Sequence, residues 1–453
     1  MATPLPPKAE IPGARVTIVG AGLAGSEAAL VLSASGTAVD LFEMRPGVSS
    51  PAHQTGWFAE LVCSNSLGAD RADSGKGLLK AELRALGSNL LRVADRVRVP
   101  AGKALAVDRE AFGRLVTGAV RSRPNIRVVE EEARTIPDDP VVIVACGPIP
   151  SAAIAESIGA LAGGSGLSFY DAISPIVDAS SLDTNRGFFA DRYGSGSGDY
   201  LNFPMTQVQY EAFLSALLSA RVVPAREFEE ERHFESCMPV EDLARRGPET
   251  LLFGPMRPVG LRDPRTGKIP YAVVQLRKEN EAGTMYNLVG FQTKLAYPEQ
   301  ERVFSLIPGL GGARFLRYGS VHRNTFLDSP RNLHASMECR NRRGLFFAGQ
   351  ITGVEGYSES IASGFVAAVS AAARVAGKEP PEFPEESMIG ALMRHITTPR
   401  RGAFQPMNAN FGLLPLPAGV RKRERKTLQA DRALSSIGEF RRRFFDFDPS
   451  CVT

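Results

Sequence analysis

A short glycine string near the start of the chain has the residue types and spacing of a dinucleotide-binding turn. The string is Gly20, Ala21, Gly22, Leu23, Ala24 and Gly25, and it directly follows the apolar run 16–19. The first glycine allows a tight turn, the second lets the backbone approach a pyrophosphate, and the third lets a helix pack closely against a strand. The free N–H groups at the start of the next helix can bind phosphate. The sequence therefore predicts that residues 20–25 bind the pyrophosphate of a dinucleotide.

An acidic residue follows at the distance along the chain that such a site requires. Glu43 ends a second apolar run, 38–42, and comes 18 residues after Gly25. In a strand–helix–strand unit of this type, an acid at the end of the second strand accepts hydrogen bonds from a ribose. We therefore expect Glu43 to bind the ribose of the adenosine half of the cofactor.

The cysteines are the other side chains that could do chemistry. There are five, and no two form a CxxC pair: Cys63, Cys146, Cys237, Cys339 and Cys451. An odd number without such a pair argues against a disulfide framework or a zinc site and favours a reducing cytoplasm. Cys237 lies in a polar stretch, whereas Cys146 ends an apolar run. From the residues alone, Cys63 and Cys237 could each be a nucleophile or a small buried hydrophobic group. We expect Cys146, Cys339 and Cys451 to be structural.

The elements that position these residues can be predicted from composition and periodicity. With 453 residues, 43% hydrophobic and 23% charged, the chain has the composition of a soluble protein with two domains. No apolar run reaches the roughly 18 residues that a membrane span needs. Residues 1–14 predict a flexible tail. Leucines at helical spacing predict helical structure in 75–95, and Asp108 is expected to cap a helix that ends at Arg121.

A change of texture in the middle of the chain predicts a second domain. Residues 168–329 are rich in proline, glycine and charge and contain short strand-like runs at 271–276 and 285–291. We interpret them as an α+β domain inserted between two parts of the nucleotide-binding domain. Apolar runs at 126–129 and 141–145 are expected to be strands of that domain's sheet.

The segment after this insertion favours FAD as the dinucleotide. Residues 344–349 form an apolar run that ends in Gly349, and a helix of small residues is expected at 360–376, after Gly353. In flavoproteins of the glutathione-reductase type, such a segment returns beneath the flavin, with the helix N-terminus facing it. No second GxGxxG follows an apolar strand, so a pyridine nucleotide would bind only transiently. The predicted fold is an α/β FAD-binding domain, 15–167 and 330–453, with the insertion at 168–329.

Positive charge is concentrated near the C-terminus. The net charge is +4, yet residues 394–443 contain 12 Lys or Arg and 3 acidic residues. Phe404, Phe411 and Phe440 lie between the basic clusters. A solvated helical surface could explain one cluster, but several clusters together favour a surface that binds a polyanion such as RNA. The residues expected to contact RNA include Arg400, Arg401, Arg421, Lys422 and Arg423.

Four longer motifs make the chain similar to one known family. They occupy residues 55–66, 234–241, 349–357 and 404–412. In this order they resemble the bacterial methylenetetrahydrofolate- and FAD-dependent tRNA (uracil-5-)-methyltransferases, TrmFO. The resemblance covers about residues 16–443. The related flavoprotein GidA shares the FAD-binding half but is longer.

The resemblance implies methylation of uridine 54 in the T-loop of tRNA, without a metal. Methylenetetrahydrofolate would provide the carbon, and FAD reduced by NAD(P)H would provide a hydride, since a methylene group is one oxidation level above methyl. A thiolate that adds to C6 of uracil activates C5, and a base then removes the C5 proton. The resemblance assigns the addition to Cys237 and the proton transfer to Cys63. Glu355 and Tyr357 are expected near the flavin or folate.

Other functions fit parts of the pattern. The same chemistry could act on ribosomal RNA. A flavin thiol oxidoreductase would lack both a CxxC pair and an NAD(P) domain. A non-catalytic flavin-containing RNA-binding protein would leave the setting of Cys63 and Cys237 unexplained.

Overall fold

The structure of the chain is a computed structural model. It describes residues 15–50, 52–162, 167–192, 198–223, 238–400, 404–416, 420–421 and 423–444, with the backbone alone for 167–172 and 321–324. Several residues singled out above lie outside these ranges: Cys237, Cys451, Arg401, Lys422 and the tail 1–14.

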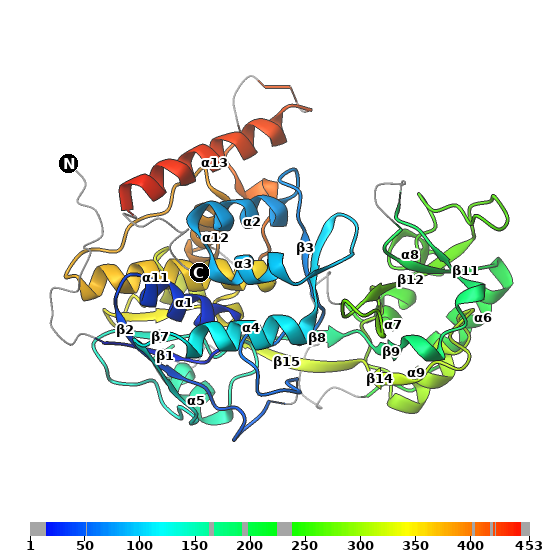
Figure 1. Ribbon diagram of the computed structural model, residues 1–453, viewed down its shortest axis with the longest axis horizontal. Coiled ribbons are helices and arrows are strands. Elements are labelled where there is room, and N and C mark those ends of the chain that lie inside the picture. Colours follow the sequence, from blue (N-terminus) through cyan, green and yellow to red (C-terminus); the bar gives the residue numbers. More distant parts are fainter. Residues whose placement is uncertain are drawn as a thin grey trace.

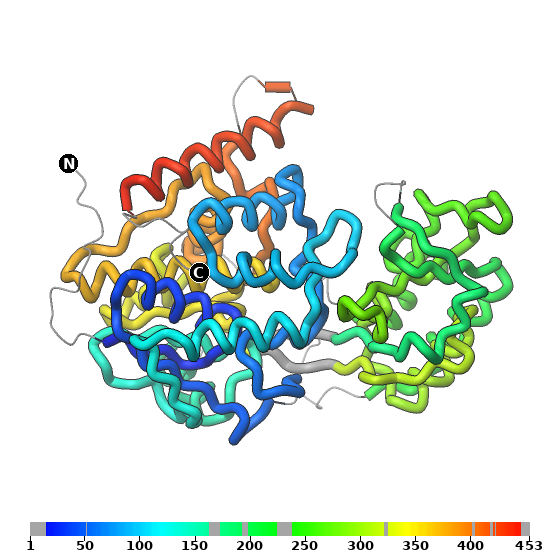
Figure 2. Tube along the Cα trace, viewed as in Figure 1, coloured from blue at the N-terminus to red at the C-terminus, as the bar shows by residue number. Residues whose placement is uncertain are grey.

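The chain forms two lobes, which are joined by a ribbon of two strands (Figure 1). The larger lobe combines the N-terminal third of the chain with its C-terminal part, and the smaller lobe contains the segment between them, coloured green in Figure 2. The ribbon consists of β8 (Leu167–Ile173) and β15 (Ser320–Phe326), which pair antiparallel. The chain therefore leaves and re-enters the larger lobe along neighbouring strands.

A five-stranded parallel sheet forms the centre of the larger lobe. Its order is β16-β7-β1-β2-β6, made of β16 (Leu345–Phe347), β7 (Val142–Val144), β1 (Arg15–Val19), β2 (Ala38–Phe42) and β6 (Ile126–Val129). Val19 at the end of β1 is level with Phe42 of β2 and Val144 of β7, so three strands end together. The parallel sheet confirms the predicted α/β fold class.

Two helices of small residues pack together on this sheet. They are α1 (Leu23–Ala34) and α11 (Tyr357–Val375), which lie side by side in Figure 1. A Cβ on Gly364 of α11 would lie 2.3 Å from the carbonyl oxygen of Ala24, closer than real atoms approach. The absence of a side chain at this position lets α11 bring its N-terminus next to the glycine string on α1.

The remaining elements of the larger lobe cover the sheet and the glycine turn. A three-stranded sheet contains β3 (Ser66–Ala69), β4 (Arg98–Val99) and β5 (Ala104–Val107). The helices are α2 (Gly75–Leu86), α3 (Asn89–Arg96), α4 (Arg109–Arg121), α5 (Ala152–Leu161), α10 (Ser329–Asn332), α12 (Met388–Thr397) and α13 (Arg425–Phe444). The side chain of Asp108 accepts a hydrogen bond from the N–H of Ala111, which confirms the predicted cap. Gly87, at φ +84°, ends α2 and divides the helical stretch 75–95 in two.

The smaller lobe has a six-stranded sheet with helices on its apolar face. The order is β10-β11-β12-β13-β9-β14, made of β10 (Phe188–Phe189), β11 (Leu201–Met205), β12 (Ala272–Lys278), β13 (Met285–Leu288), β9 (Ile176–Asp178) and β14 (Phe315–Arg317). Its helices are α6 (Gln207–Leu218), α7 (Val240–Arg245), α8 (Thr250–Phe253) and α9 (Tyr297–Phe304). Leu201, Val274 and Leu288 belong to the apolar core of this lobe. Because side chains alternate along a strand, their neighbours point to the opposite face.

The aromatic residues near the C-terminus do not form the surface that the sequence suggested. Phe404 is 4% exposed and Phe440 is 5% exposed, and both belong to the core of the larger lobe. Phe440 packs on Phe383, with ring centroids 4.4 Å apart. Phe440 therefore helps to hold α13 in place, and both rings are core residues that are not available to stack on nucleic-acid bases.

Candidate active site

A deep cleft opens where β1, β2 and β7 end. The empty space in it, including the part open to solvent, is about 1050 Å³, and ligands of α/β proteins bind at this edge of a parallel sheet. The cleft is lined from one end to the other by residues 42–45 after β2, by the glycine turn, by residues 145–151 after β7, and by Gly349, Gln350, Tyr357 and Ser360. It therefore extends from the end of β2 to the start of α11.

The three glycines of the turn have different surroundings. Gly20 has φ +99°, and a Cβ there would lie 2.6 Å from the carbonyl oxygen of Ala145. A Cβ on Gly25 would lie 1.8 Å from the carbonyl oxygen of Gly20. Gly22 lines the cleft, and no atom lies within 4 Å of the position of its Cβ. Gly20 and Gly25 are required for the fold of the turn, whereas Gly22 leaves space open to a ligand.

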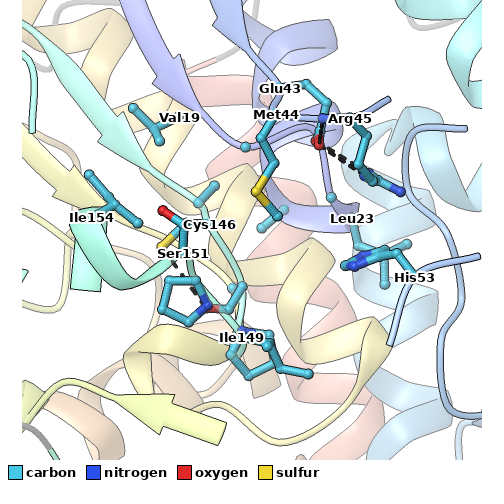
Figure 3. Close-up of a pocket in the computed structure, with 18 of the residues that line it drawn as sticks. Val19, Leu23, Glu43, Met44, Arg45, His53, Cys146, Ile149, Ser151 and Ile154 are labelled. Carbon is cyan, nitrogen blue, oxygen red and sulfur yellow. Dashed lines mark hydrogen bonds and ion pairs between the residues drawn. The ribbon is translucent and has the colours of Figure 1, made fainter. Parts of the chain in front are cut away.

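Glu43 lies at the cleft but is already held by a neighbouring arginine. Its carboxylate accepts hydrogen bonds from the N–H of Ala21 at 2.9 Å and from Nε of Arg45 at 2.9 Å. Figure 3 shows Glu43 and Arg45 joined on one side of the cleft. Burial alone would raise the pKa of Glu43, but the hydrogen bonds and charge of Arg45 bring that pKa below its usual value. Glu43 is therefore an anion, and Arg45 is a cleft residue that no sequence motif indicated.

The opposite wall of the cleft carries Cys146. This thiol and Ser151 follow the end of β7 and lie across the cleft from Glu43 (Figure 3). Burial raises the pKa of the Cys146 thiol to about 12. Cys146 is consequently a neutral thiol at physiological pH, in agreement with a structural role.

The residues predicted around the start of α11 fall into two groups. Gly349 and Tyr357 line the cleft. Gly353 instead packs on Phe404, because a Cβ there would lie 2.4 Å from the phenyl ring. The N–H of Glu355 donates a hydrogen bond to the carbonyl oxygen of Met407, which fastens this loop to the segment 404–412. Neither Gly353 nor Glu355 is among the residues that line the cleft.

Tyr357 connects the cleft with the segment of Cys63. Its hydroxyl oxygen accepts hydrogen bonds from the N–H of Cys63 at 2.7 Å and the N–H of Ser64 at 3.1 Å. Burial raises the pKa of the Tyr357 hydroxyl, so it stays protonated. The predicted thiol is thus brought beside the end of the cleft where α11 begins.

Three arginines surround this segment, and none of them belongs to a recognisable sequence motif. Arg109 begins α4, Arg277 is on β12 and Arg317 ends β14. Burial works against the charge of Arg109, but Glu279, with an ion pair of 2.9 Å, raises its pKa above the usual value. Burial and the nearby charge of Arg109 lower the pKa of Arg317. Both lobes therefore contribute cations to the surroundings of Cys63.

The described part of the chain contains no group of three His, Cys, Asp or Glu side chains that could hold a metal ion. It also contains no helix with the length and apolar character that a bilayer crossing requires.

The chain is similar over almost its whole length to a set of curated enzymes. It is 53% identical over 427 residues to the methylenetetrahydrofolate–tRNA-(uracil-5-)-methyltransferase TrmFO of Natranaerobius thermophilus, and the match covers 94% of this chain and 99% of the relative. It is 54% identical over 431 residues to the enzyme of the same name from Moorella thermoacetica, at 94% and 99%. The chain belongs to the TrmFO family.

More distant comparisons place TrmFO in a wider group. The family profile described as glucose inhibited division protein A matches residues 15–379. A crystal structure of GidA from Aquifex aeolicus has a TM-score of 0.70 at 18% identity, and the match covers 94% of this chain and 73% of GidA. At this identity the likeness concerns the fold alone. GidA therefore shares the fold of this chain over most of its length.

Proposed function

We propose that this protein uses methylenetetrahydrofolate to methylate C5 of uridine in tRNA, at position 54 of the T-loop, with FAD as its bound cofactor. The observation that carries the proposal is an identity above 50% to curated TrmFO enzymes over 94% of the chain. The dinucleotide cleft that ends beside a cysteine supports it independently.

The cleft has the features that FAD requires. Gly22 leaves room for a pyrophosphate at the N-terminus of α1, where the N–H groups of the first turn and the helix dipole favour anions. Glu43 and Arg45 would hold the adenosine end, and Tyr357 and Ser360 would lie beside the flavin. Reduced FAD would supply the hydride that converts a methylene group into a methyl group. NAD(P)H would bind transiently and reduce the FAD.

The chain's own groups would perform the remaining chemistry. Tyr357 holds the backbone of Cys63 and Ser64, so it fixes where the Cys63 thiol can reach. Arg109 and Arg317 place positive charge near this thiol. Cys237 would add to C6 of uracil and Cys63 would remove the C5 proton.

The basic surface near the C-terminus would bind the RNA. Arg423, Lys426, Arg442 and Arg443 are exposed on or just before α13, which lies on the outside of the larger lobe over α2 (Figure 1). Cations on one solvent-facing helix suit contacts with phosphates, which position an RNA without selecting its sequence.

The test is an assay of the purified protein. It would be incubated with tRNA that lacks 5-methyluridine, methylenetetrahydrofolate and NADPH, and the nucleosides would be analysed by mass spectrometry. We expect 5-methyluridine at position 54 and none when the folate is omitted. Methylation of ribosomal RNA but not of tRNA would contradict the proposed substrate, and absence of both would contradict the proposed activity.

A further inference from the structure

The face of the smaller lobe that meets the Cys63 segment is buried and polar. On β11, β12 and β13 the side chains that alternate with the core residues are Asn202, Gln275, Arg277 and Asn287, each less than 10% exposed. Arg277 donates to Asn65 Oδ1 at 2.9 Å and to Ser64 Oγ at 2.8 Å. Polar groups of this kind are costly to bury, so their presence beside Cys63 suggests a functional role.

Three atoms in this region have no hydrogen-bond partner although they are buried. They are Nη2 of Arg109, Oε1 of Glu279 and Nδ2 of Asn287. Nη2 of Arg109 lies 2.9 Å from Oε2 of Glu279 as an ion pair, without the alignment of a hydrogen bond. Glu279 is 1% exposed and Asn287 is 2% exposed. Most buried polar atoms in native proteins are hydrogen-bonded, and an unpaired one indicates a ligand or a water that would satisfy it.

These atoms lie close together in the fold. The ion pair joins Arg109 directly to Glu279. Asn287 is directly opposite Arg277 in the pairing of β12 with β13. Because side chains alternate, Glu279, two residues beyond Arg277, lies diagonally from Asn287 on the same face. The three atoms therefore provide a donor, an acceptor and a second donor at one junction.

This set is complementary to the imide edge of uracil. That edge carries the O2 and O4 acceptors on either side of the N3–H donor. We propose that Arg109, Glu279 and Asn287 bind the imide edge of the target uracil and so determine its selection over cytosine. Cytosine has a donor at C4 and an acceptor at N3, so it would place like groups against each other. A guanidinium at a uracil carbonyl would also stabilise the negative charge that develops when a thiolate adds to C6.

The junction between the lobes is built so that a base can enter. Its contacts are polar: Arg277 with Asn65, Arg109 with Glu279, and the Tyr200 hydroxyl with the carbonyl oxygen of Ala101 at 3.0 Å. The apolar cores of the two lobes are separate clusters. Separation at the junction would therefore expose groups that water can hydrate, and among the described residues it would open no apolar core shared by the two lobes.

The inference rests on the proposed function, and it is tested with variants of Asn287 in the full-length, FAD-loaded enzyme. Asn287→Asp turns the donor into an acceptor, and Asn287→Leu removes it without adding charge. Gln275→Glu is the matched control, because it makes the same amide-to-acid change on the same face, where Arg192 already contacts residue 275 at 3.0 Å. The probes are T-arm hairpins with uridine or cytidine at the target position.

We expect at least a tenfold loss of kcat/KM for the uridine hairpin in both Asn287 variants. In Asn287→Asp, the ratio of the Kd for the cytidine hairpin to the Kd for the uridine hairpin should approach one. In Gln275→Glu this ratio should stay at its wild-type value. The KM for methylenetetrahydrofolate and the rate of flavin reduction should not change.

The proposal would be overturned by variants that keep both rate and preference, by equal losses in the control, or by a change confined to the KM for the folate. A wild-type enzyme that methylates no RNA would instead overturn the proposed function, and this inference with it.

Discussion

The hydroxyl oxygen of Tyr357 accepts a hydrogen bond of 2.7 Å from the backbone N–H of Cys63, although 294 residues separate them in the chain. One residue begins α11 and lines the cleft, and the other lies between β2 and β3. A second bond of 3.1 Å to the N–H of Ser64 makes the contact bidentate. The position of the candidate catalytic thiol is therefore fixed by a residue that lines the cleft.

Replacing Tyr357 by Phe should release the Cys63 segment from α11. The change leaves two N–H groups without their acceptor, which costs about 1–3 kcal/mol for each one that stays dry. We expect kcat for methylation to fall at least tenfold while FAD content is retained, measured by the flavin absorbance of the purified variant. Tyr210→Phe removes a hydroxyl from the smaller lobe, where it donates to the carbonyl oxygen of Pro248, and is the control for reduced stability alone. Unchanged kcat in Tyr357→Phe would contradict the role in positioning Cys63.

Substitutions at two glycines of the turn should have different effects, one on FAD binding and the other on stability. Gly22→Leu should abolish FAD binding and leave the melting temperature of the FAD-free protein unchanged, because no atom lies within 4 Å of the new Cβ. Gly25→Ala should destabilise even the FAD-free protein by about 3 kcal/mol, because its Cβ would lie 1.8 Å from a carbonyl oxygen. Thermal unfolding with and without FAD measures both. Full FAD content in Gly22→Leu would contradict this assignment of the pyrophosphate site.

His53 should make the protein sensitive to acid. Burial, together with the charge of Arg45, lowers the pKa of His53 to about 4, against about 6.5 for an unfolded histidine. Between these values the unfolded chain binds a proton that the native state does not, so the free energy of unfolding falls as the pH decreases from about 6.5 to about 4. The decrease is at most about 3 kcal/mol. Denaturation of wild type and His53→Gln at about pH 7 and about pH 4.5 measures it, and equal slopes would contradict the prediction.

The elements of the larger lobe were predictable because each has a local signal. The glycine string, the run before Glu43 and the Asp108 cap depend on neighbouring residues, and the structure contains β1, α1, β2 and α4 where they were expected. The break at Gly87 was missed because leucines at helical spacing continue across it. The left-handed conformation of Gly87 ends α2, and the side chain of Ser88 caps the start of α3.

The surroundings of Cys63 could not be predicted for a different reason. Arg109, Arg277 and Arg317 come from three elements that are distant in the sequence. Their separations follow no pattern that would mark them as one site. Arg277 lies one residue beyond the predicted strand-like run 271–276, in the observed strand β12. Alternation continued along this strand could have marked it as facing away from the core. That the opposite face is also buried depends on the docking of the two lobes, which no local pattern encodes. Arg45 was missed for another reason: it is only two residues from Glu43, but no sequence motif marks it as a residue of the cleft.

The basic surface should contribute affinity that depends on salt. Replacing Arg421, Arg423 and Lys426 by Gln should weaken tRNA binding and flatten the dependence of log K on log salt by up to about one for each phosphate that these cations neutralise, because fewer counterions are released. FAD content should not change. The control replaces three exposed arginines of the smaller lobe by Gln: Arg186, Arg245 and Arg262. An equal loss of affinity in both triple variants would indicate a general charge effect and would make residues 421–426 an ordinary solvated surface.

The division of labour between the two candidate thiols can be decided by trapping. If Cys237 adds to C6, Cys237→Ala should form no covalent adduct with RNA that contains 5-fluorouridine, and Cys63→Ala should still form one, because fluorine blocks only the later removal of the C5 proton. Both variants should lose methylation and keep FAD. Cys146→Ala is the control: its thiol has a pKa raised by burial to about 12, so its removal should leave turnover intact.

Gel shift under denaturing conditions and mass spectrometry of the adduct give the readout. An adduct that persists in Cys237→Ala and vanishes in Cys63→Ala would reverse the two roles, and the contact with Tyr357 would then hold the nucleophile in place of the base. Methylation retained in both variants would exclude a mechanism through either cysteine.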